Sequence, residues 1–274
     1  MPPGTDLAPR TDVLTGTGVD ERLRLRAAAS VLPPGAAIAR RSAAAVHGFR
    51  SAMPHEAAHG GDVEVVLPVG SSTMRRPGIR SYSAVTDGDV VVLDGLPLTS
   101  ALRTALDAAR FEAPPVALAM LDLGLRRGLF SREQAQLRLA AQPGERGVAR
   151  ARRLFVLADP GAESPGESWL RLRCADAGFP PLTTQIEVPR GRGRVYRLDA
   201  GWPERRLAVE YDGREFHEGA AQRAHDERRR AHLARLGWTV VAVGAGEVLG
   251  RSLHLERGLG ELLGVEPRIL TRTW

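Results

Sequence analysis

The sequence predicts an α/β protein, α+β overall, that is divided into two domains. Runs with helical periodicity alternate with short, valine-rich extended runs along the chain. The 274 residues are enough for two domains, each with its own core. The segment from Asp159 to Gly166 holds two Pro-Gly pairs and interrupts every regular pattern. We therefore place the boundary near residue 161, which separates residues 1–161 from residues 162–274.

Two helices are predicted near the beginning of the first domain. Helical periodicity runs from Asp20 to about Val31, where Pro33-Pro34-Gly35 ends it, and a second helix follows near residues 40–47, ended by Gly48. This pair has the size of a helix-turn-helix. Extended runs that are rich in valine, or bounded by glycine and proline, follow at residues 62–69, 78–84 and 90–93. These strands would form a wing beside the two helices.

Four helices are predicted to complete the first domain, beginning in turn at Thr99 or Ser100, at Pro114, at Ser131 and at about Gly147. Proline is favoured in a first helical turn, where its missing N–H costs nothing. Ser131 with Gln134 has the spacing of a capping box, in which each residue satisfies a backbone N–H of the other. We expect a helical region after the wing.

The second domain is predicted to contain a central mixed sheet. Ser164 and Glu167 have the spacing of a capping box for a helix that reaches Ala177, with Gly178 as its stop. Three extended runs follow, at residues 184–188, 194–199 and 207–212. A helix at residues 220–236, a strand at residues 239–243 and a final helix close the chain.

The composition favours a soluble protein of a reducing cytoplasm. The net charge is +6, a balance that attracts polyanions without proving that any bind. All 38 basic residues are arginine, which a GC-rich coding bias explains as well as a preference for phosphate does. Cys174 is the only cysteine, so an internal disulfide is excluded and zinc spacing is absent. We expect neither a secretory signal nor a membrane span.

The strand predicted at residues 207–212 carries the chemistry of the second domain. Side chains alternate along a strand, so Glu210 and Asp212 would share one face while the apolar residues share the other. Two carboxylates on one face repel each other unless a cation lies between them. Asp199, from the preceding strand, is a candidate third ligand, and His217 follows shortly after. The pattern indicates a divalent-cation site.

This order of Glu167, Asp199, Glu210-Tyr211-Asp212 and His217 resembles the PD-(D/E)XK nuclease superfamily. The run from Ala208 to His217 is most similar to Vsr-like (very-short-patch-repair) endonucleases, and the likeness covers about the last 110 residues, from Glu163 on. It implies a restriction-endonuclease-like domain with Mg²⁺-dependent hydrolysis of DNA phosphodiesters.

The resemblance also implies a role for each acidic residue. Asp199 and Glu210 would bind Mg²⁺ or Mn²⁺, together with Asp212, and Glu167 would be an auxiliary ligand. Asp212 stands where the superfamily has lysine, so His217 is the candidate acid–base group. Arg214, or an arginine of the 228–230 run, is the alternative for stabilising the phosphate.

Each of these residues also has a structural interpretation. Glu167 is explained equally well as a capping residue, and Asp212-Gly213 is a common turn dipeptide. Asp199 alternatively pairs with a neighbouring arginine at the sheet edge, and a histidine such as His217 is more often an ordinary loop residue. Glu210 favours a site because an acid inside an apolar strand is costly to desolvate.

Residues 20–160 resemble the winged-helix and following helical region of AbiEi-type antitoxins, the repressor-like halves of type IV toxin–antitoxin systems. The resemblance implies a winged-helix-like region that binds DNA. A toxin or other operon partner and a homodimer are candidate assemblies. Arginines at the start of the second helix, around a glycine hairpin and along a late helix are candidate DNA contacts, although ion pairs on a solvated helix face would explain the last group: Arg40, Arg41, Arg190, Arg192, Arg194, Arg228, Arg229 and Arg230.

Two functions therefore follow from the sequence. One is a DNA-binding protein with a Mg²⁺-dependent endonuclease domain. The alternative is a non-enzymatic transcriptional regulator or antitoxin-like repressor in which the nuclease fold only binds. The two differ in whether metal and Glu210 matter for function.

Overall fold

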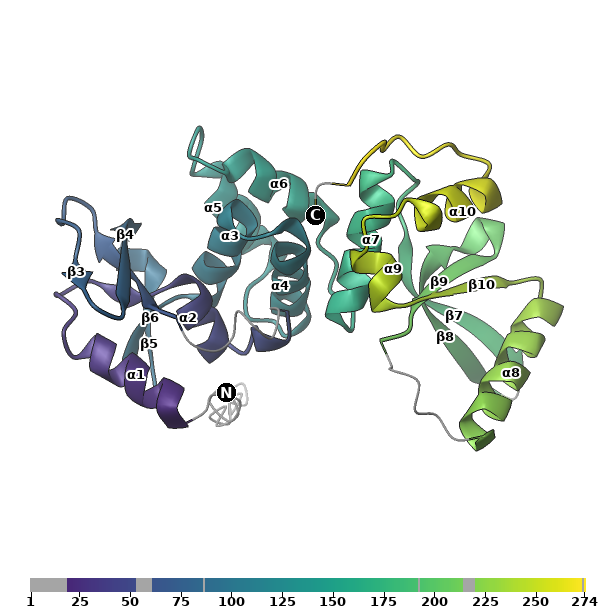
Figure 1. Cartoon of the computed structure of the whole chain (residues 1–274), viewed down its shortest axis with the longest axis horizontal. Coiled ribbons are helices and arrows are strands. Elements are labelled where there is room, and N and C mark those ends of the chain that lie inside the picture. Colours follow the sequence, from purple (N-terminus) through teal and green to yellow (C-terminus); the bar gives the residue numbers. More distant parts are fainter. Residues whose placement is uncertain (1–18, 53–60, 86, 192, 214–219, 273) are drawn as a thin grey trace, which may run out of the picture.

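A computed structural model describes residues 19–52, 61–85, 87–191, 193–213, 220–272 and 274. Two sheets, one in each half of the chain, are separated by a group of helices (Figure 1). The mixed α/β class predicted from the sequence is confirmed. None of the described helices has the length and apolar character needed to cross a membrane.

The N-terminal sheet has six strands in the order β3-β4-β2-β1-β6-β5. Strand β2 runs parallel to β4 and β1 runs parallel to β6, whereas the other neighbours are antiparallel. The elements of this part are α1 (Val19–Ala29), β1 (Ala37–Ile38), α2 (Arg40–Val46), a 3-10 turn (Arg50–Ala52), β2 (Val63–Pro68), β3 (Arg75–Arg76), β4 (Ile79–Val85), a second 3-10 turn (Asp87–Asp89), β5 (Val90–Leu93) and β6 (Leu96–Thr99).

One face of this sheet is covered by α1 and α2. Leu25 of α1 and Val46 of α2 pack against Ile38, Val65 and Leu98 of the strands. These positions are almost completely buried, so the two helices and the sheet form one core. Strands β1, β3 and β6 were not predicted from the sequence. They are two to four residues long, too short for alternation to be visible.

Four helices follow the sheet: α3 (Ala101–Phe111), α4 (Pro114–Arg126), α5 (Arg132–Ala140) and α6 (Val148–Leu157). Ser100 caps α3 by accepting from the backbone N–H of Arg103, and the predicted capping box of Ser131 and Gln134 is present. Leu106, Leu118, Leu121 and Leu154 lie at the centre of their shared core. The predicted helical region is confirmed.

The C-terminal sheet has the order β10-β9-β8-β7, with β10 parallel to β9 and the other pairs antiparallel. The elements of this half are α7 (Pro165–Asp176), β7 (Thr183–Gly191), β8 (Arg194–Trp202), a 3-10 turn (Pro203–Arg205), β9 (Leu207–Tyr211), α8 (Ala220–Arg235), β10 (Thr239–Val243), α9 (Ala245–Leu249) and α10 (His254–Leu263). Leu207 and Val209 of β9 face a core shared with α7 and α10, whereas Ala208 faces Leu233 of α8. The predicted central mixed sheet is therefore present.

Helix α7 belongs to both halves of the molecule. Its Leu172 is buried in the core of α3 to α6, while Leu170 and Cys174 are buried in the C-terminal core. Arg171 crosses to α4, where its Nη1 donates to Asp122 at 2.8 Å. The predicted boundary near residue 161 precedes this helix, and the position of the cut stays a prediction.

Candidate nucleic-acid interface and acidic site

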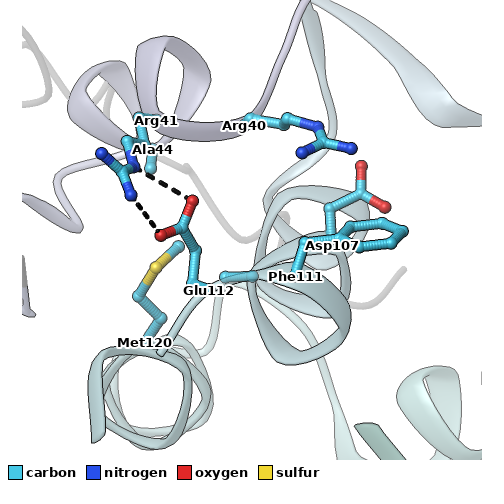
Figure 2. A pocket seen from close by; sticks show the side chains of 8 residues that line it. Arg40, Arg41, Ala44, Asp107, Phe111, Glu112 and Met120 are labelled. Atoms are coloured by element: carbon cyan, nitrogen blue, oxygen red, sulfur yellow. Dashed lines mark hydrogen bonds and ion pairs between the residues drawn. The ribbon is translucent and has the colours of Figure 1, made fainter. Parts of the chain in front are cut away.

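The predicted DNA contact at the start of α2 lies within a network of internal bonds. The backbone N–H of Arg41 donates to Glu64 of β2 at 3.0 Å, so a carboxylate already occupies the positive end of this helix. The Arg41 guanidinium donates to Glu112 through Nε at 3.0 Å and Nη2 at 2.7 Å (Figure 2). This bond raises the pKa of Arg41. Its side chain is nevertheless 49% exposed.

Arg40 is held by two aromatic rings. Its guanidinium lies 3.6 Å from the ring centre of Tyr82 and 4.6 Å from that of Phe111. These are cation–π distances. The backbone of Arg40 has φ +50°, a left-handed conformation that is costly for a side-chain-bearing residue. Arg40 is thus positioned by packing, and its contact with DNA stays a prediction.

A small cavity lies between these arginines, α3 and α4 (Figure 2). Its volume is about 10 Å³, which is no more than one water molecule requires. Its lining comprises Arg40, Arg41, Ala44, Asp107, Ala108, Phe111, Glu112 and Met120. The cavity is too small for a nucleotide or an organic ligand.

The predicted acidic site gathers at one end of the C-terminal sheet, but each described acid there is already bonded. Asp199 accepts from the backbone N–H of Tyr211 at 2.9 Å. Burial, and the nearby charges of Glu167 and Glu210, raise the pKa of Asp199 to about 6. The three carboxylates are therefore electrostatic neighbours, as the sequence analysis predicted.

Glu167 makes the bonds of a helix-capping residue. Its carboxylate accepts from the backbone N–H of Glu163 at 2.9 Å and from the Ser164 hydroxyl at 2.8 Å. Ser164 in turn accepts from the Glu167 N–H at 3.2 Å and caps α7. The capping interpretation thus accounts for this residue without a metal.

Glu210 is paired with Arg229 of α8. Nη1 of Arg229 donates to one carboxylate oxygen at 2.8 Å, and Nη2 donates to the other. Nη2 also donates to the carbonyl of Arg197 at 3.0 Å. The side chains are 18% and 22% exposed, so the pair is partly shielded from water. A bidentate guanidinium therefore occupies both oxygens that a metal would need.

The remaining predicted ligands do not complete a metal site in the described part of the chain. Asp212 is exposed and interacts with another residue, while its backbone N–H donates to Val243 at 2.9 Å. His217, Arg214 and Arg192 lie outside the described residues. Among the residues that the structure describes, no three histidine, cysteine or acidic side chains form a metal-binding group. The described side chains, as placed, do not fit Mg²⁺.

The other predicted DNA contacts border the same sheet. Arg194 of β8 and Arg228 and Arg230 of α8 are exposed, and Arg228 interacts with another residue. Arg190 is half-buried, with its guanidinium 5.0 Å from the ring centre of Tyr196. These arginines are accessible from solvent to different degrees, and DNA contact by them stays a prediction.

Comparisons with known proteins identify a domain in the N-terminal half. Residues 35–157 match the family described as the AbiEi antitoxin C-terminal domain. This region begins after α1 and contains the six-stranded sheet and helices α2 to α6. Residues 35–157 are thus similar to the AbiEi antitoxin C-terminal domain, whereas no comparison shows the nuclease resemblance of the C-terminal half.

Two curated relatives come from Mycobacterium tuberculosis, strains CDC 1551 / Oshkosh and ATCC 25618 / H37Rv, and both are described as uncharacterized proteins. Each is 39% identical over 150 residues, which are 55% of this chain and 55% of the relative. The chain therefore matches about half the length of these relatives. No solved structure shows a significant match.

Three partners in these networks were missed by the sequence analysis. Glu64 and Glu112 hold Arg41, and Arg229 was predicted to meet phosphate rather than to bind Glu210. The pairs are separated by 19 to 71 residues along the chain. Pairing at such distances depends on the tertiary packing, which local spacing does not reveal. The abundance of arginine in the sequence was the only signal that indicated such ion pairs.

Proposed function

We propose that this chain is a DNA-binding regulator of the antitoxin type, acting in the cytoplasm with a toxin as its partner. The match of residues 35–157 to the AbiEi antitoxin C-terminal domain carries the proposal. The positive net charge and the helix pair packed on a mixed sheet are in keeping with DNA binding.

A footprint on the DNA upstream of the protein's own gene tests the binding. We expect a protected site that persists in EDTA and with Glu210→Ala, because the regulator needs neither metal nor acidic site. Glu204→Ala, an exposed acid of the same half, is the matched control. Protection that requires Mg²⁺, or no protection at micromolar protein, would contradict the proposal.

The toxin partner requires its own experiment. We expect expression of a neighbouring gene alone to arrest growth, and co-expression of this chain to relieve the arrest. Co-expression of the empty vector in place of this chain is the negative control. Relief by that control, or no relief by the full chain, would contradict the antitoxin role.

We propose Mg²⁺-dependent DNA endonuclease activity as a second candidate. It is favoured by one observation, the raised pKa of Asp199 between Glu167 and Glu210, which is typical of sites that handle charge. Metal binding would require Arg229 to leave Glu210, because the described arrangement does not fit Mg²⁺. We therefore rank this function below the regulator.

Plasmid cleavage with Mg²⁺ or Mn²⁺ tests the second candidate. We expect nicking of plasmid or of mismatched duplex by the wild type, lost with Glu210→Ala and retained with Glu204→Ala. Equal cleavage by wild type and Glu210→Ala would show a contaminant. Absence of cleavage with both metals would remove the candidate.

A further inference from the structure

We propose that the β3–β4 hairpin is the surface that binds the phosphate backbone of double-stranded DNA, through Arg75, Arg76 and Arg80. The inference rests on the proposed function and names a surface for it, distinct from the arginines at the start of α2. None of these three arginines was a candidate in the sequence analysis.

The register of the hairpin brings Arg75 and Arg80 together on one face, with Arg76 beside Arg75 on the same short strand. Strands β3 and β4 are antiparallel, with Arg75 opposite Arg80 and Arg76 opposite Ile79. Side chains directly opposite in such a pair start about 5 Å apart, and like charges there are destabilising. Pro77 and Gly78, with φ +76° at Gly78, form the tight turn between them. The fold thus concentrates cations on a short, constrained segment.

Little negative charge offsets these arginines. Nε of Arg80 lies 3.8 Å from a carboxylate oxygen of Asp62, and the two side chains are 65% and 45% exposed. A pair that is so open to solvent is weak. Arg75 and Arg76 are exposed, and the structure shows no ion pair for either within the described residues. Glu64 is committed to Arg41 and Tyr82. The hairpin keeps an excess of positive charge.

The hairpin is also shaped to receive an extended ligand. An open hollow of about 560 Å³ is bounded by the three arginines, Asp62, Met74 and Ser81, among others. The Ser81 hydroxyl donates to the carbonyl of Met74 at 3.0 Å and accepts from its N–H at 3.1 Å. These two bonds tie the segment before β3 to β4. The surface is therefore ordered before any ligand binds, which reduces the entropic cost of binding.

Position and chemistry favour duplex DNA as the ligand. β3 is the edge strand of the sheet, and the hairpin lies at the outer end of the N-terminal half (Figure 1). Guanidinium groups bind phosphate oxygens in a bidentate manner. By contrast, Arg40 and Arg41 are committed to Tyr82, Phe111 and Glu112. Arg75 and Arg76 offer their charges without breaking an ion pair of the described residues, and Arg80 would give up only its weak, exposed pair with Asp62.

Fluorescence anisotropy tests the inference. The full chain is titrated into a labelled DNA duplex of about three helical turns, taken from the region upstream of the protein's own gene. We compare wild type with a triple alanine variant, Arg75→Ala, Arg76→Ala and Arg80→Ala. The matched control removes the same charge from three exposed arginines elsewhere, Arg146→Ala, Arg251→Ala and Arg257→Ala. A triple lysine variant at 75, 76 and 80 keeps the charge.

We expect the hairpin alanine variant to lose on the order of tenfold to hundredfold in affinity near physiological salt, and its slope of log K against log salt to fall by about 2 to 3. The control and lysine variants should keep the wild-type slope. Thermal unfolding checks that the alanine variant is folded. If it is not, the double variant Arg75→Gln and Arg76→Gln replaces it, and the slope of log K against log salt should then be smaller than that of the wild type by about 2.

Two results overturn the inference in distinguishable ways. If the wild type and the hairpin alanine variant bind DNA equally well, the hairpin is not the DNA-binding surface, although the proposed DNA-binding function stands. The hairpin would then be a candidate surface for an acidic partner protein. Wild-type protein that binds no duplex overturns the proposed DNA-binding function and this surface with it. A lysine variant as weak as the alanine variant also overturns the inference, because charge would then not be the cause.

Discussion

The start of α2 and the acidic end of the C-terminal sheet each contain an arginine–glutamate ion pair, but the two pairs differ in how far their side chains are shielded from water. Arg41 binds Glu112 with half of its side chain in water, whereas Arg229 binds Glu210 with both side chains largely shielded. Both places were predicted as functional, the first because two arginines begin the second helix and the second because two acids share one face of a strand. The comparison shows that charge concentrated in the sequence does not by itself distinguish an internal ion pair from a binding surface. At the β3–β4 hairpin, by contrast, Arg75 and Arg76 make no ion pair within the described residues.

A more deeply buried pair than either of these is that of Arg171 and Asp122, with side chains 7% and 2% exposed. We expect Arg171→Ala to lower the free energy of unfolding by about 3 to 5 kcal/mol, because Asp122 would remain buried without a countercharge. Urea unfolding measures the change. Arg126→Ala, which removes a more exposed arginine of α4, is the control and should cost less than half as much. Equal costs would contradict the dependence on depth.

The partly shielded pair at the acidic site should give an intermediate effect. We expect Arg229→Ala to lower the free energy of unfolding by about 1 to 2 kcal/mol, since Glu210 then faces Asp199 and Glu167 without a countercharge. Adding Glu210→Gln to that variant should restore part of the loss. Urea unfolding of the single and double variants, beside Arg230→Ala, measures it. No restoration would show that Arg229 acts through packing alone.

The raised pKa of Asp199 predicts a smaller effect that depends on pH. The folded-state pKa, about 6, lies above the unfolded value near 3.9, so the folded state binds more protons between these values and loses stability as pH rises from about 4 to about 6. Asp199→Asn removes this loss while its side-chain oxygen still accepts from Tyr211.

After allowance for solvent screening, we expect the Asp199→Asn variant to exceed wild type by about 1 kcal/mol above pH 7 and to match it near pH 4. Denaturant unfolding at the two pH values makes the comparison. If the difference in stability between the variant and the wild type is the same at both pH values, titration of Asp199 does not cause it.

The exposed pair at α2 should give the smallest effect. We expect Arg41→Ala to change the free energy of unfolding by less than about 1 kcal/mol, because the Arg41 side chain is half in water and its Coulomb energy with Glu112 is screened. Thermal unfolding at low and high salt measures it, and salt should reduce the difference further. A loss as large as that of Arg229→Ala would remove the distinction between the two regions.

Local patterns predicted the long elements well. The cap at Ser100, the capping box at Ser131 and the strand β9 lie where the sequence analysis placed them, because each depends on residues close together in the chain. Strands β1, β3 and β6 were missed because they are only two to four residues long. Strand β1 in addition depends on residues far along the chain, since Ala37 pairs with Val66, whereas β3 and β6 form hairpins with the adjacent β4 and β5. The hairpin between β7 and β8 was predicted but extends further than expected.

The candidate site was predictable in composition but not in bonding. The charges of Glu167 and Glu210 act on Asp199, whereas the predicted roles of these acids and of Asp212 as catalytic residues or metal ligands stay predictions. The sequence analysis did not foresee that Arg229 would reach Glu210 from α8, which requires knowing how the helix packs across the sheet. Pairing of Asp199 with a neighbouring arginine was an open alternative, but the partner of Glu210 lies 19 residues away along the chain, on a helix.

The position of α7 bears on how this chain must be handled in the laboratory. Leu172 completes one hydrophobic core and Leu170 completes the other, while Gly166 allows the helix to approach Tyr211 so closely that a Cβ there would lie 2.0 Å from the ring. A fragment cut at either end of α7 would expose an apolar surface on one of its products. Shortened versions should therefore aggregate, and the intact chain should melt in one cooperative transition.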